Sequence, residues 1–165
     1  MIFVILGTNP FQFDRLFKIA DEYAMKTEEE VFVQAGYTKY SPKYCSFEKF
    51  LSRENYIDKI KKSEILIAHA GIGVTLDAIK YKKKLIVVPR LAKFNEHTDN
   101  HQCELARVLV EQRRVLALNE NMGVEEIISV IERSKKDYFT QQEPTSNILV
   151  CKLTEYIKKL EAKWH

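Results

Sequence analysis

Residues 65–77 read ILIAHAGIGVTLD, and this stretch decides the fold. Its first four residues are apolar without alternation, which is typical of a strand covered on both faces, as in a parallel sheet. A loop with two glycines one residue apart follows, and residues 74–81 then carry apolar residues at helical spacing. A buried strand that passes through a turn into a helix is the building unit of an α/β domain.

The same alternation of strand-like and helix-like segments continues along the chain. Short β-branched runs predict buried strands at 2–6, 31–35, 65–68, 85–88 and 115–118. Amphipathic stretches predict helices at about 13–25, 55–62, 74–81, 99–110 and 124–135. Residues 36–52 lack a clear period and are expected to hold a loop and one short element. We therefore predict an α/β fold with a doubly wound, Rossmann-like parallel sheet covered by helices.

The 165 residues divide into two expected regions. Residues 1–135 are expected to form the sheet domain, since a domain of roughly 100–200 residues can bury its own core. Residues 136–165 are expected to be a polar connection and a C-terminal amphipathic helix at about 148–160. Two interpretations of that helix stay open, because its apolar face could pack on the sheet domain or against a partner protein.

The charge balance limits the classes of partner. Lysine and arginine number 26 and aspartate and glutamate 23, which leaves a formal net charge of +3. This surplus is too small to predict a nucleic-acid binder, although it suits an anionic ligand or a membrane surface. The basic residues at 80 and 82–84 are expected to form a solvated helix end.

Cysteine usage and the N-terminal residues indicate a cytoplasmic protein. Cys45, Cys103 and Cys151 are too widely spaced for a disulfide framework or a clustered zinc site, so we expect free thiols in a reducing compartment. The apolar residues 1–6 lack the basic flank of a signal peptide. No apolar run approaches the ~20 residues that a membrane-spanning helix needs.

The glycine loop is the first candidate site, because ligands of doubly wound sheets lie beyond the carboxyl ends of the strands. Gly71 and Gly73 let the backbone approach a ligand, and the following helix offers unpaired amides and its positive dipole end, which together would cradle an anion. The alternative is a tight turn that binds nothing. His69 is either a packed histidine or a phosphate contact. Asp77 is expected in the first helical turn, where its carboxylate would interact with the helix dipole or accept hydrogen bonds from ribose hydroxyls.

The loop after residue 89 is the second candidate site, since it holds the densest polar cluster of the chain. Asp99 and Gln102 have the spacing of a capping box. His97 and His101 have the spacing of helical metal ligands, but a helix that begins near Asp99 leaves His97 outside it, so we expect no metal site. No nucleophile has a convincing partner, and covalent catalysis is not indicated.

Together these loops resemble the C-terminal, nucleotide-sugar-binding half of GT-B glycosyltransferases of family 28. The resemblance covers residues 1–135 and depends on GT at 7–8 with FDRL at 13–16, QAG at 34–36, HAGIG at 69–73, VVP at 87–89 and DNHQ at 99–102. Within the family the chain is similar to small stand-alone subunits. These are the eukaryotic subunit that adds the second GlcNAc of the dolichol-linked oligosaccharide and, as the better match, bacterial PssE-type subunits of capsule or exopolysaccharide synthesis.

The resemblance implies a UDP-sugar donor, inversion at the anomeric carbon, and no cofactor or metal ion for donor binding. Asp77 would hold the ribose, Gln102 would meet the sugar hydroxyls, and the backbone around 50–52 would hold uracil. Val74 stands where relatives carry a small hydroxyl residue, and Thr75 is expected to replace that contact. The full set of implied donor-binding residues is Thr8, His69, Gly71, Gly73, Thr75, Asp77, Asp99, Asn100 and Gln102.

The resemblance also implies a missing half. A complete GT-B enzyme has an amino-terminal domain that binds the acceptor and commonly supplies the general base, whereas this chain starts at the donor half. We therefore expect a membrane-associated partner subunit that binds a polyprenyl-diphosphate-linked acceptor and recruits the chain to the inner face of the membrane. The catalytic base is unknown, and His97 is the fallback. Two alternatives are a non-catalytic accessory subunit that activates a partner glycosyltransferase, and a nucleotide-binding enzyme of another family.

Overall fold

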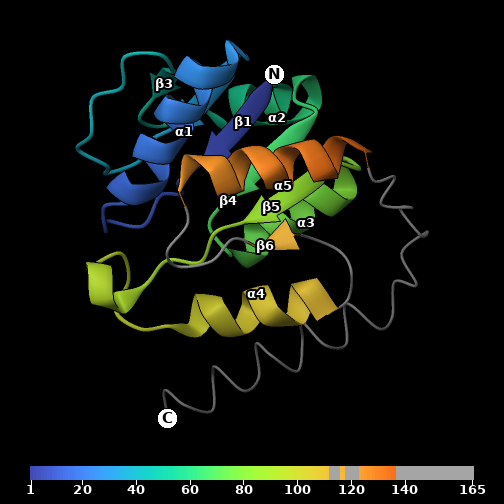
Figure 1. The fold of residues 1–165 in the computed structure, drawn as a ribbon. Coiled ribbons are helices and arrows are strands. Elements are labelled where there is room, and N and C mark those ends of the chain that lie inside the picture. The colour runs from blue at the N-terminus through green and yellow to red at the C-terminus, as the bar shows by residue number, and fades with distance from the viewer. Residues whose placement is uncertain (112–115, 118–122, 137–165) are drawn as a thin grey trace.

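The computed structural model describes residues 1–111, 116–117 and 123–136, which form a parallel sheet between two layers of helices (Figure 1). The strand order is β3-β2-β1-β4-β5-β6, and every neighbouring pair is parallel. The strands are β1 (Ile2–Ile5), β2 (Val31–Gln34), β3 (Ser46–Glu48), β4 (Ile65–Ala68), β5 (Lys84–Val87) and β6 (Leu116–Ala117). The predicted doubly wound sheet is confirmed, and its strand order reverses between β1 and β4.

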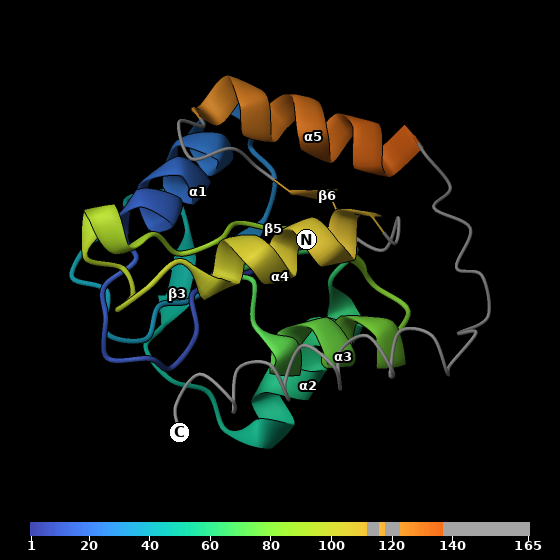
Figure 2. The same cartoon turned by 90° about the horizontal axis from the view of Figure 1, so that it is seen from below.

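Helices cover both faces of this sheet (Figure 2). α1 and α5 share a core with one face, and α2, α3 and α4 share a core with the other. The helices are α1 (Asp14–Thr27), α2 (Arg53–Lys62), α3 (Ile72–Lys80), α4 (His101–Glu111) and α5 (Val124–Lys136), with a 3₁₀ turn η1 (Ala92–Phe94) between β5 and α4.

β1 shows why the central strands are mainly apolar. Ile2 and Val4 pack into the core with α1 and α5, while Phe3 and Ile5 pack into the core with α2, α3 and α4. None of the four is more than 3% exposed. Burying a side chain of this size contributes about 1.5–3 kcal/mol, and a polar residue on either face would lose its contact with water.

The short element expected within 36–52 is the strand β3, whose pattern does not mark it as a strand. Its three residues are exposed at the edge of the sheet. The loop before β3 is fixed by the buried carboxylate of Asp21 on α1, which accepts five hydrogen bonds from that loop. The donors are the Tyr40 hydroxyl and the backbone N–H groups of Lys43, Tyr44 and Cys45.

Three helices begin two residues away from the expected start, and the first of them, α2, begins at Arg53 rather than at 55. α3 begins at Ile72 rather than at 74, so Asp77 lies beyond the first turn and outside the region where the helix dipole acts most strongly. α4 begins at His101 rather than at 99. The predicted helix at 148–160 and Cys151 lie outside the described residues. Within the part of the chain that the structure describes, no helix is long and apolar enough to cross a membrane.

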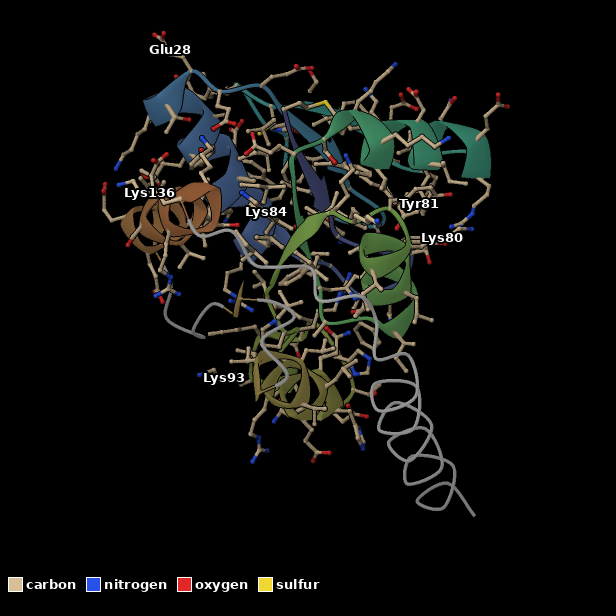
Figure 3. The ribbon with its side chains drawn as sticks, turned by 90° about the vertical axis from the view of Figure 1, so that its right-hand side faces the viewer. Glu28, Lys80, Tyr81, Lys84, Lys93 and Lys136 are labelled. Atoms are coloured by element: carbon tan, nitrogen blue, oxygen red, sulfur yellow. The ribbon has the colours of Figure 1, made fainter. Side chains whose placement is uncertain are left out.

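The basic residues at 80 and 82–84 lie at the end of α3 and the start of β5. The Lys83 ammonium donates to two backbone carbonyls at the end of α2, at 2.7 and 2.6 Å. Lys80 lies 5.4 Å from the centroid of the Tyr81 ring. Figure 3 shows Lys80 and Lys84 well separated from Lys93, which belongs to the turn after β5. These lysines therefore lie away from the carboxyl edge of the sheet, and Lys83 stabilises a helix C-terminus.

Candidate functional site

Four loops meet at the carboxyl edge of the sheet. The last residue of β1 is paired with the last residues of β2 and β4, and the last residue of β4 with that of β5, so these strands end in register. The loops that follow them carry most of the predicted site residues. This edge includes the point between β1 and β4 where strand order reverses, at which doubly wound sheets bind their ligands.

Glycines allow these loops to pack closely. Gly7 has φ +91° and Gly36 has φ +58°, which are left-handed values that favour glycine. A Cβ on Gly36 would overlap the carbonyl oxygen of Gly7, and a Cβ on Gly7 would lie 2.6 Å from Nε2 of His69. A Cβ on Gly71 would lie 2.7 Å from Nδ1 of the same ring. The His69 imidazole is therefore held between two glycines.

The His69 ring is neutral at physiological pH. Burial lowers the pKa of His69 to about 4, and the positive charges of Arg90 and His97 act in the same direction. Its Nδ1 is buried and has no hydrogen-bond partner among the residues that the structure describes. Leaving a buried polar atom unpaired costs about 1–3 kcal/mol, so such an atom is a candidate ligand contact.

The start of α3 lies next to this ring and offers backbone donors. Gly71 is the N-cap residue and has no side chain to satisfy the first amides of the helix. Gly73 is exposed, and apart from the backbone of its own helix no atom of the described residues lies within 4 Å of the position that its Cβ would take. The first-turn amides and the positive end of the helix dipole therefore favour an anion here. Thr8 is exposed in the neighbouring loop after β1.

The Thr75 side chain, predicted to join this anion cradle, is turned inward. Thr75 is fully buried, and its hydroxyl donates to the Gly71 carbonyl oxygen at 2.8 Å. Such bonding to the carbonyl four residues earlier is common for threonine in helices. Val74 is also buried, in the core beneath α3. The cradle therefore consists of backbone groups and His69, and a phosphate contact by Thr75 stays a prediction.

Asp77 already has a charged partner. The guanidinium of Arg53 binds its carboxylate in a bidentate pair, with N–O distances of 3.1 and 3.0 Å. Arg53 also lies 5.4 Å from the centroid of the Tyr56 ring. Sequence reasoning missed Arg53, because it lies 24 residues from Asp77 and no local pattern joins them.

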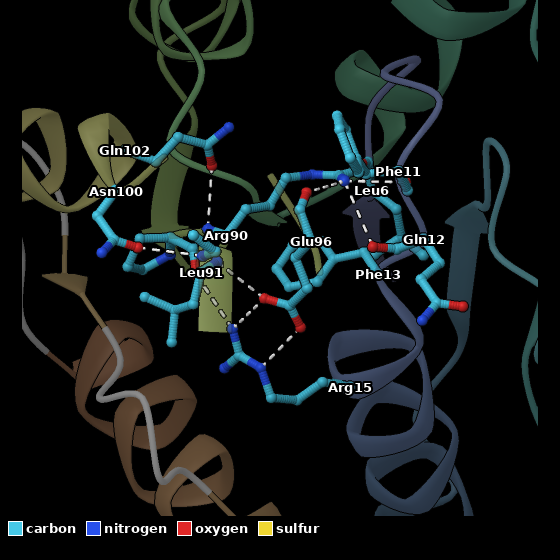
Figure 4. Close-up of polar contacts among 12 residues, drawn as sticks. Leu6, Phe11, Gln12, Phe13, Arg15, Arg90, Leu91, Glu96, Asn100 and Gln102 are labelled. Atoms are coloured by element: carbon cyan, nitrogen blue, oxygen red, sulfur yellow. Dashed lines mark hydrogen bonds and ion pairs between the residues drawn. The ribbon is translucent and has the colours of Figure 1, made fainter. Parts of the chain in front are cut away.

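Arg90 connects the loop after β1 to the loop after β5 (Figure 4). It is only 1% exposed, and its guanidinium donates to the carbonyl oxygens of Leu6 at 2.6 Å, Phe11 at 2.9 Å and Glu96 at 2.8 Å. The guanidinium lies 4.9 Å from the centroid of the Phe13 ring. Burial lowers the pKa of Arg90 to about 10, against the opposing effect of the Glu96 charge, so the side chain stays charged at neutral pH.

A second buried pair joins α1 to the same loop. Glu96, 2% exposed, accepts from Nε of Arg15 at 3.0 Å and from its terminal nitrogen at 2.8 Å. Glu96 also accepts from the backbone N–H of Leu91 at 3.0 Å. Sequence reasoning assigned no role to Arg15, Arg90 or Glu96. Arg15 and Glu96 are 81 residues apart, so no local pattern joins them. For Arg90, its position next to a buried strand was the one local signal of a structural role.

The carboxylate of Asp99 contacts the rings of two histidines. Its Oδ1 lies 3.2 Å from Nδ1 of His97 and 2.6 Å from Nδ1 of His101. Burial alone would raise the pKa of Asp99, but hydrogen bonds from the backbone and ring of His101 and the nearby histidine charges hold it below its ordinary value. Among residues 1–111, 116–117 and 123–136, no group of three or more His, Cys, Asp or Glu is arranged to hold a metal ion.

The predicted capping box of Asp99 and Gln102 is wrong, because Gln102 has another partner. Its Oε1 accepts from the backbone N–H of Arg90 at 3.1 Å, and Oδ1 of Asn100 accepts from the N–H of Ala92 at 3.1 Å. Both amide oxygens therefore hold the backbone of the loop after β5. In this orientation, which the hydrogen bonds assign, their NH₂ groups are the donors left for other contacts.

A hollow of about 380 Å³ lies at the opposite edge of the sheet, between the end of α1 and the start of β2. Glu28, Glu29 and Glu30 line it, and Figure 3 shows Glu28 far from Lys93. Three neighbouring carboxylates oppose an anionic ligand. The carboxyl edge, with its cradle and convergent polar groups, is therefore the candidate site.

This fold and this edge define the class of doubly wound α/β domains with an anion cradle where the strand order reverses. The chain belongs to the family described as the glycosyltransferase family 28 C-terminal domain, whose model matches residues 1–161. The family that the sequence motifs resemble is thereby confirmed.

Two curated relatives bear the name UDP-N-acetylglucosamine transferase subunit ALG13. The one from Kluyveromyces lactis is 30% identical over 103 residues, which is 62% of this chain and 48% of that protein. The one from Yarrowia lipolytica is 27% identical over 104 residues, which is 63% of this chain and 51% of that protein. The chain thus spans about half the length of the curated relatives it matches.

Solved structures with the same fold include larger glycosyltransferases. CalG4, the calicheamicin glycosyltransferase, aligns with a TM-score of 0.68 at 16% identity over 86% of this chain and 35% of its own. SsfS6 from Streptomyces sp. SF2575, complexed with thymidine diphosphate, aligns with a TM-score of 0.56 at 19% identity over 83% of this chain and 33% of its own. At these identities the likeness shows the fold, which is that of one half of a GT-B glycosyltransferase.

Proposed function

We propose that this chain is the donor-binding, catalytic subunit of a two-component inverting glycosyltransferase that uses a UDP-sugar. The observation that carries the proposal is the neutral His69 ring, held between Gly7 and Gly71 with an unpaired Nδ1 beside the start of α3. In a domain of this glycosyltransferase family, such a cradle suits the diphosphate of a nucleotide sugar.

The proposed chemistry of the cradle is electrostatic. When the bond between the anomeric carbon and the diphosphate oxygen breaks, negative charge grows on the departing UDP. The first-turn amides of α3 and its dipole stabilise that charge. His69 adds a hydrogen bond as a neutral ring and needs no protonation to do so. The donor is bound without a metal ion or other cofactor, because these groups supply the stabilisation.

The remaining predicted contacts belong to the nucleoside and the sugar. Asp77, held by Arg53, accepts hydrogen bonds from the ribose hydroxyls, and the backbone at 50–52 lies against uracil. Asn100 and Gln102 donate to sugar hydroxyls through their NH₂ groups. Asp99 and the exposed Thr8 complete the set, on the sugar side and the diphosphate side respectively.

A membrane-associated partner subunit supplies the acceptor site in this proposal. The curated relatives are named as subunits of a transferase, which supports a partner for this chain as well. The acceptor is a polyprenyl-diphosphate-linked intermediate of capsule or exopolysaccharide synthesis, to which a hexose is added at the cytoplasmic face of the membrane. The partner also supplies the general base. Within this chain His97 is the fallback, because it is the histidine of the loop after β5 that lies beside Asp99.

UDP binding by calorimetry tests the cradle directly. Gly73→Asp places a carboxylate at the open start of α3 and is expected to weaken UDP binding at least tenfold through repulsion of the diphosphate. Gly123→Asp is the matched control, because Gly123 is equally open and directly precedes α5. Unchanged UDP affinity in a folded Gly73→Asp variant would reject the cradle.

Co-expression with the partner separates the catalytic from the accessory interpretation. A screen of UDP-sugars would follow transfer of radiolabel to membrane lipid, with wild-type chain or Gly73→Asp. A donor-binding subunit loses transfer with that variant while the complex still forms. Full transfer by a complex that contains Gly73→Asp would favour an accessory subunit that activates its partner without holding the donor.

A further inference from the structure

We infer that Arg90 is a positioning residue for the donor site, because its buried guanidinium holds the loop after β1 and the loop after β5 at one fixed spacing (Figure 4). This inference rests on the proposed function, since it assigns those loops to the two sides of the donor pocket. Arg90 itself is not proposed to touch the donor.

Two of the carbonyl oxygens that Arg90 binds belong to residues that are close in sequence to the predicted site residues. It donates to the carbonyl of Leu6, which precedes Gly7, and to the carbonyl of Glu96, which precedes His97. A third bond reaches Phe11, further along the loop after β1. Surface loops are mobile by default, whereas buried carbonyls need donors. One side chain therefore ties both loops together at the points where they approach the ligand.

A second anchor supports this arrangement from α1. Arg15 forms the bidentate pair with Glu96, and the Phe13 ring lies between the two guanidinium groups, 5.4 Å from that of Arg15 and 4.9 Å from that of Arg90. The three charged groups leave one surplus positive charge under the cradle. One nitrogen of each arginine is also buried and has no partner within the described part of the chain. The network therefore favours a nearby anion as well as a fixed spacing.

Lysine is not equivalent to arginine at this position. One terminal nitrogen of the guanidinium donates to Phe11 and Glu96 and the other donates to Leu6, whereas an ammonium is a single nitrogen that cannot take both positions. Arg90→Lys therefore keeps the positive charge but cannot keep all three bonds. Arg90→Met loses both, and Glu96→Gln removes the charge that pairs with Arg15 while it preserves the shape of the side chain.

The experiment compares these variants with Glu29→Gln, a matched control that breaks a half-buried ion pair with Lys135 at the far edge of the sheet. Three measurements are made below the melting temperature of each variant. They are hydrogen exchange of amides at 7–13 and 91–98 relative to β1 and β4, UDP affinity by calorimetry, and NMR titration of the His69 ring.

Arg90→Lys and Glu96→Gln are expected to raise exchange in both loops at least tenfold and to weaken UDP binding about tenfold, while Glu29→Gln changes neither. Arg90→Lys keeps the positive charge that acts on His69, so the pKa of His69 is expected to stay low. Arg90→Met removes that charge, so the pKa of His69 is expected to rise. A purely structural role of Arg90 would give the same pKa in both variants. Wild-type exchange and affinity in folded Arg90→Lys and Glu96→Gln overturn the inference. If wild type binds no UDP, alone or with its partner, the proposed function fails, and loop exchange still decides the role of Arg90.

Discussion

Gly71→Ala tests whether the His69 ring depends on contact with Gly71. The added Cβ would lie 2.7 Å from Nδ1 of the buried ring, far inside ordinary contact distance. The backbone itself tolerates alanine, because Gly71 has φ −104° and ψ 144°. Gly73→Ala makes the same chemical change two residues later, where the new methyl group would meet no described residue beyond the backbone of its own helix within 4 Å.

The two substitutions are expected to change stability in opposite directions. Overpacking a buried site costs about 1–3 kcal/mol, and 1 kcal/mol shifts the melting temperature of a chain of this size by about 2–4 °C. Gly71→Ala is therefore expected to melt about 2–12 °C below wild type. Gly73→Ala replaces glycine by alanine inside a helix, which stabilises by up to about 1 kcal/mol and raises the melting temperature by up to about 4 °C.

Thermal unfolding followed by circular dichroism measures these shifts, and calorimetry measures UDP binding. Displacement of His69 removes one hydrogen bond of about 1–1.5 kcal/mol, so Gly71→Ala is expected to bind UDP about tenfold more weakly. A Gly71→Ala variant that melts and binds UDP as wild type does would refute the packing of His69 against Gly71.

Three further changes test other parts of the molecule. Asp21→Asn is expected to lower the free energy of unfolding by about 2–4 kcal/mol at pH 7, since its NH₂ would face N–H donors. Burial would raise the pKa of Asp21, but its hydrogen bonds hold the pKa below the unfolded value. The stabilisation by the carboxylate is therefore full above about pH 4 and is lost as the pH falls through the folded pKa. Urea unfolding at pH 7 and pH 2.5 checks this, and the same difference in free energy between wild type and Asp21→Asn at both pH values would contradict it. Asp77→Asn is expected to weaken UDP binding about tenfold and to leave inorganic pyrophosphate binding unchanged in calorimetry, whereas equal losses would exclude the ribose role. Gln102→Glu keeps the acceptor for the Arg90 N–H but loses the NH₂ donor, so it is expected to raise the KM for the UDP-sugar about tenfold in the reconstituted complex, as Gln102→Ala does; a wild-type KM for Gln102→Glu would show that the amide donor is unused.

The central strands could be predicted because burial on both faces leaves a local mark. Every residue of β1, β2 and β4 is buried, and all of them are apolar except Gln34 at the end of β2. β3 has no such mark, because its residues are exposed and a carboxylate on α1 fixes the loop before it. The starts of the helices were predicted less exactly than the central strands, because apolar spacing marks a helix without marking its first residue. The apolar spacing that marks α3 does not reveal that Ile72, rather than residue 74, begins it.

The sequence by itself determined the order of the helices and of every strand except β3, the doubly wound class and the loops that hold the candidate site, since apolar periodicity and glycine positions are local properties. Only the tertiary structure decided which polar groups meet. Arg90 bonds a carbonyl 84 residues away, and Arg15 pairs with a carboxylate 81 residues away. The inward turn of Thr75 and the pairing of Asp77 were settled in the same way. A charged or polar side chain has several possible partners along a chain, and the crossovers that bring strand ends side by side select among them.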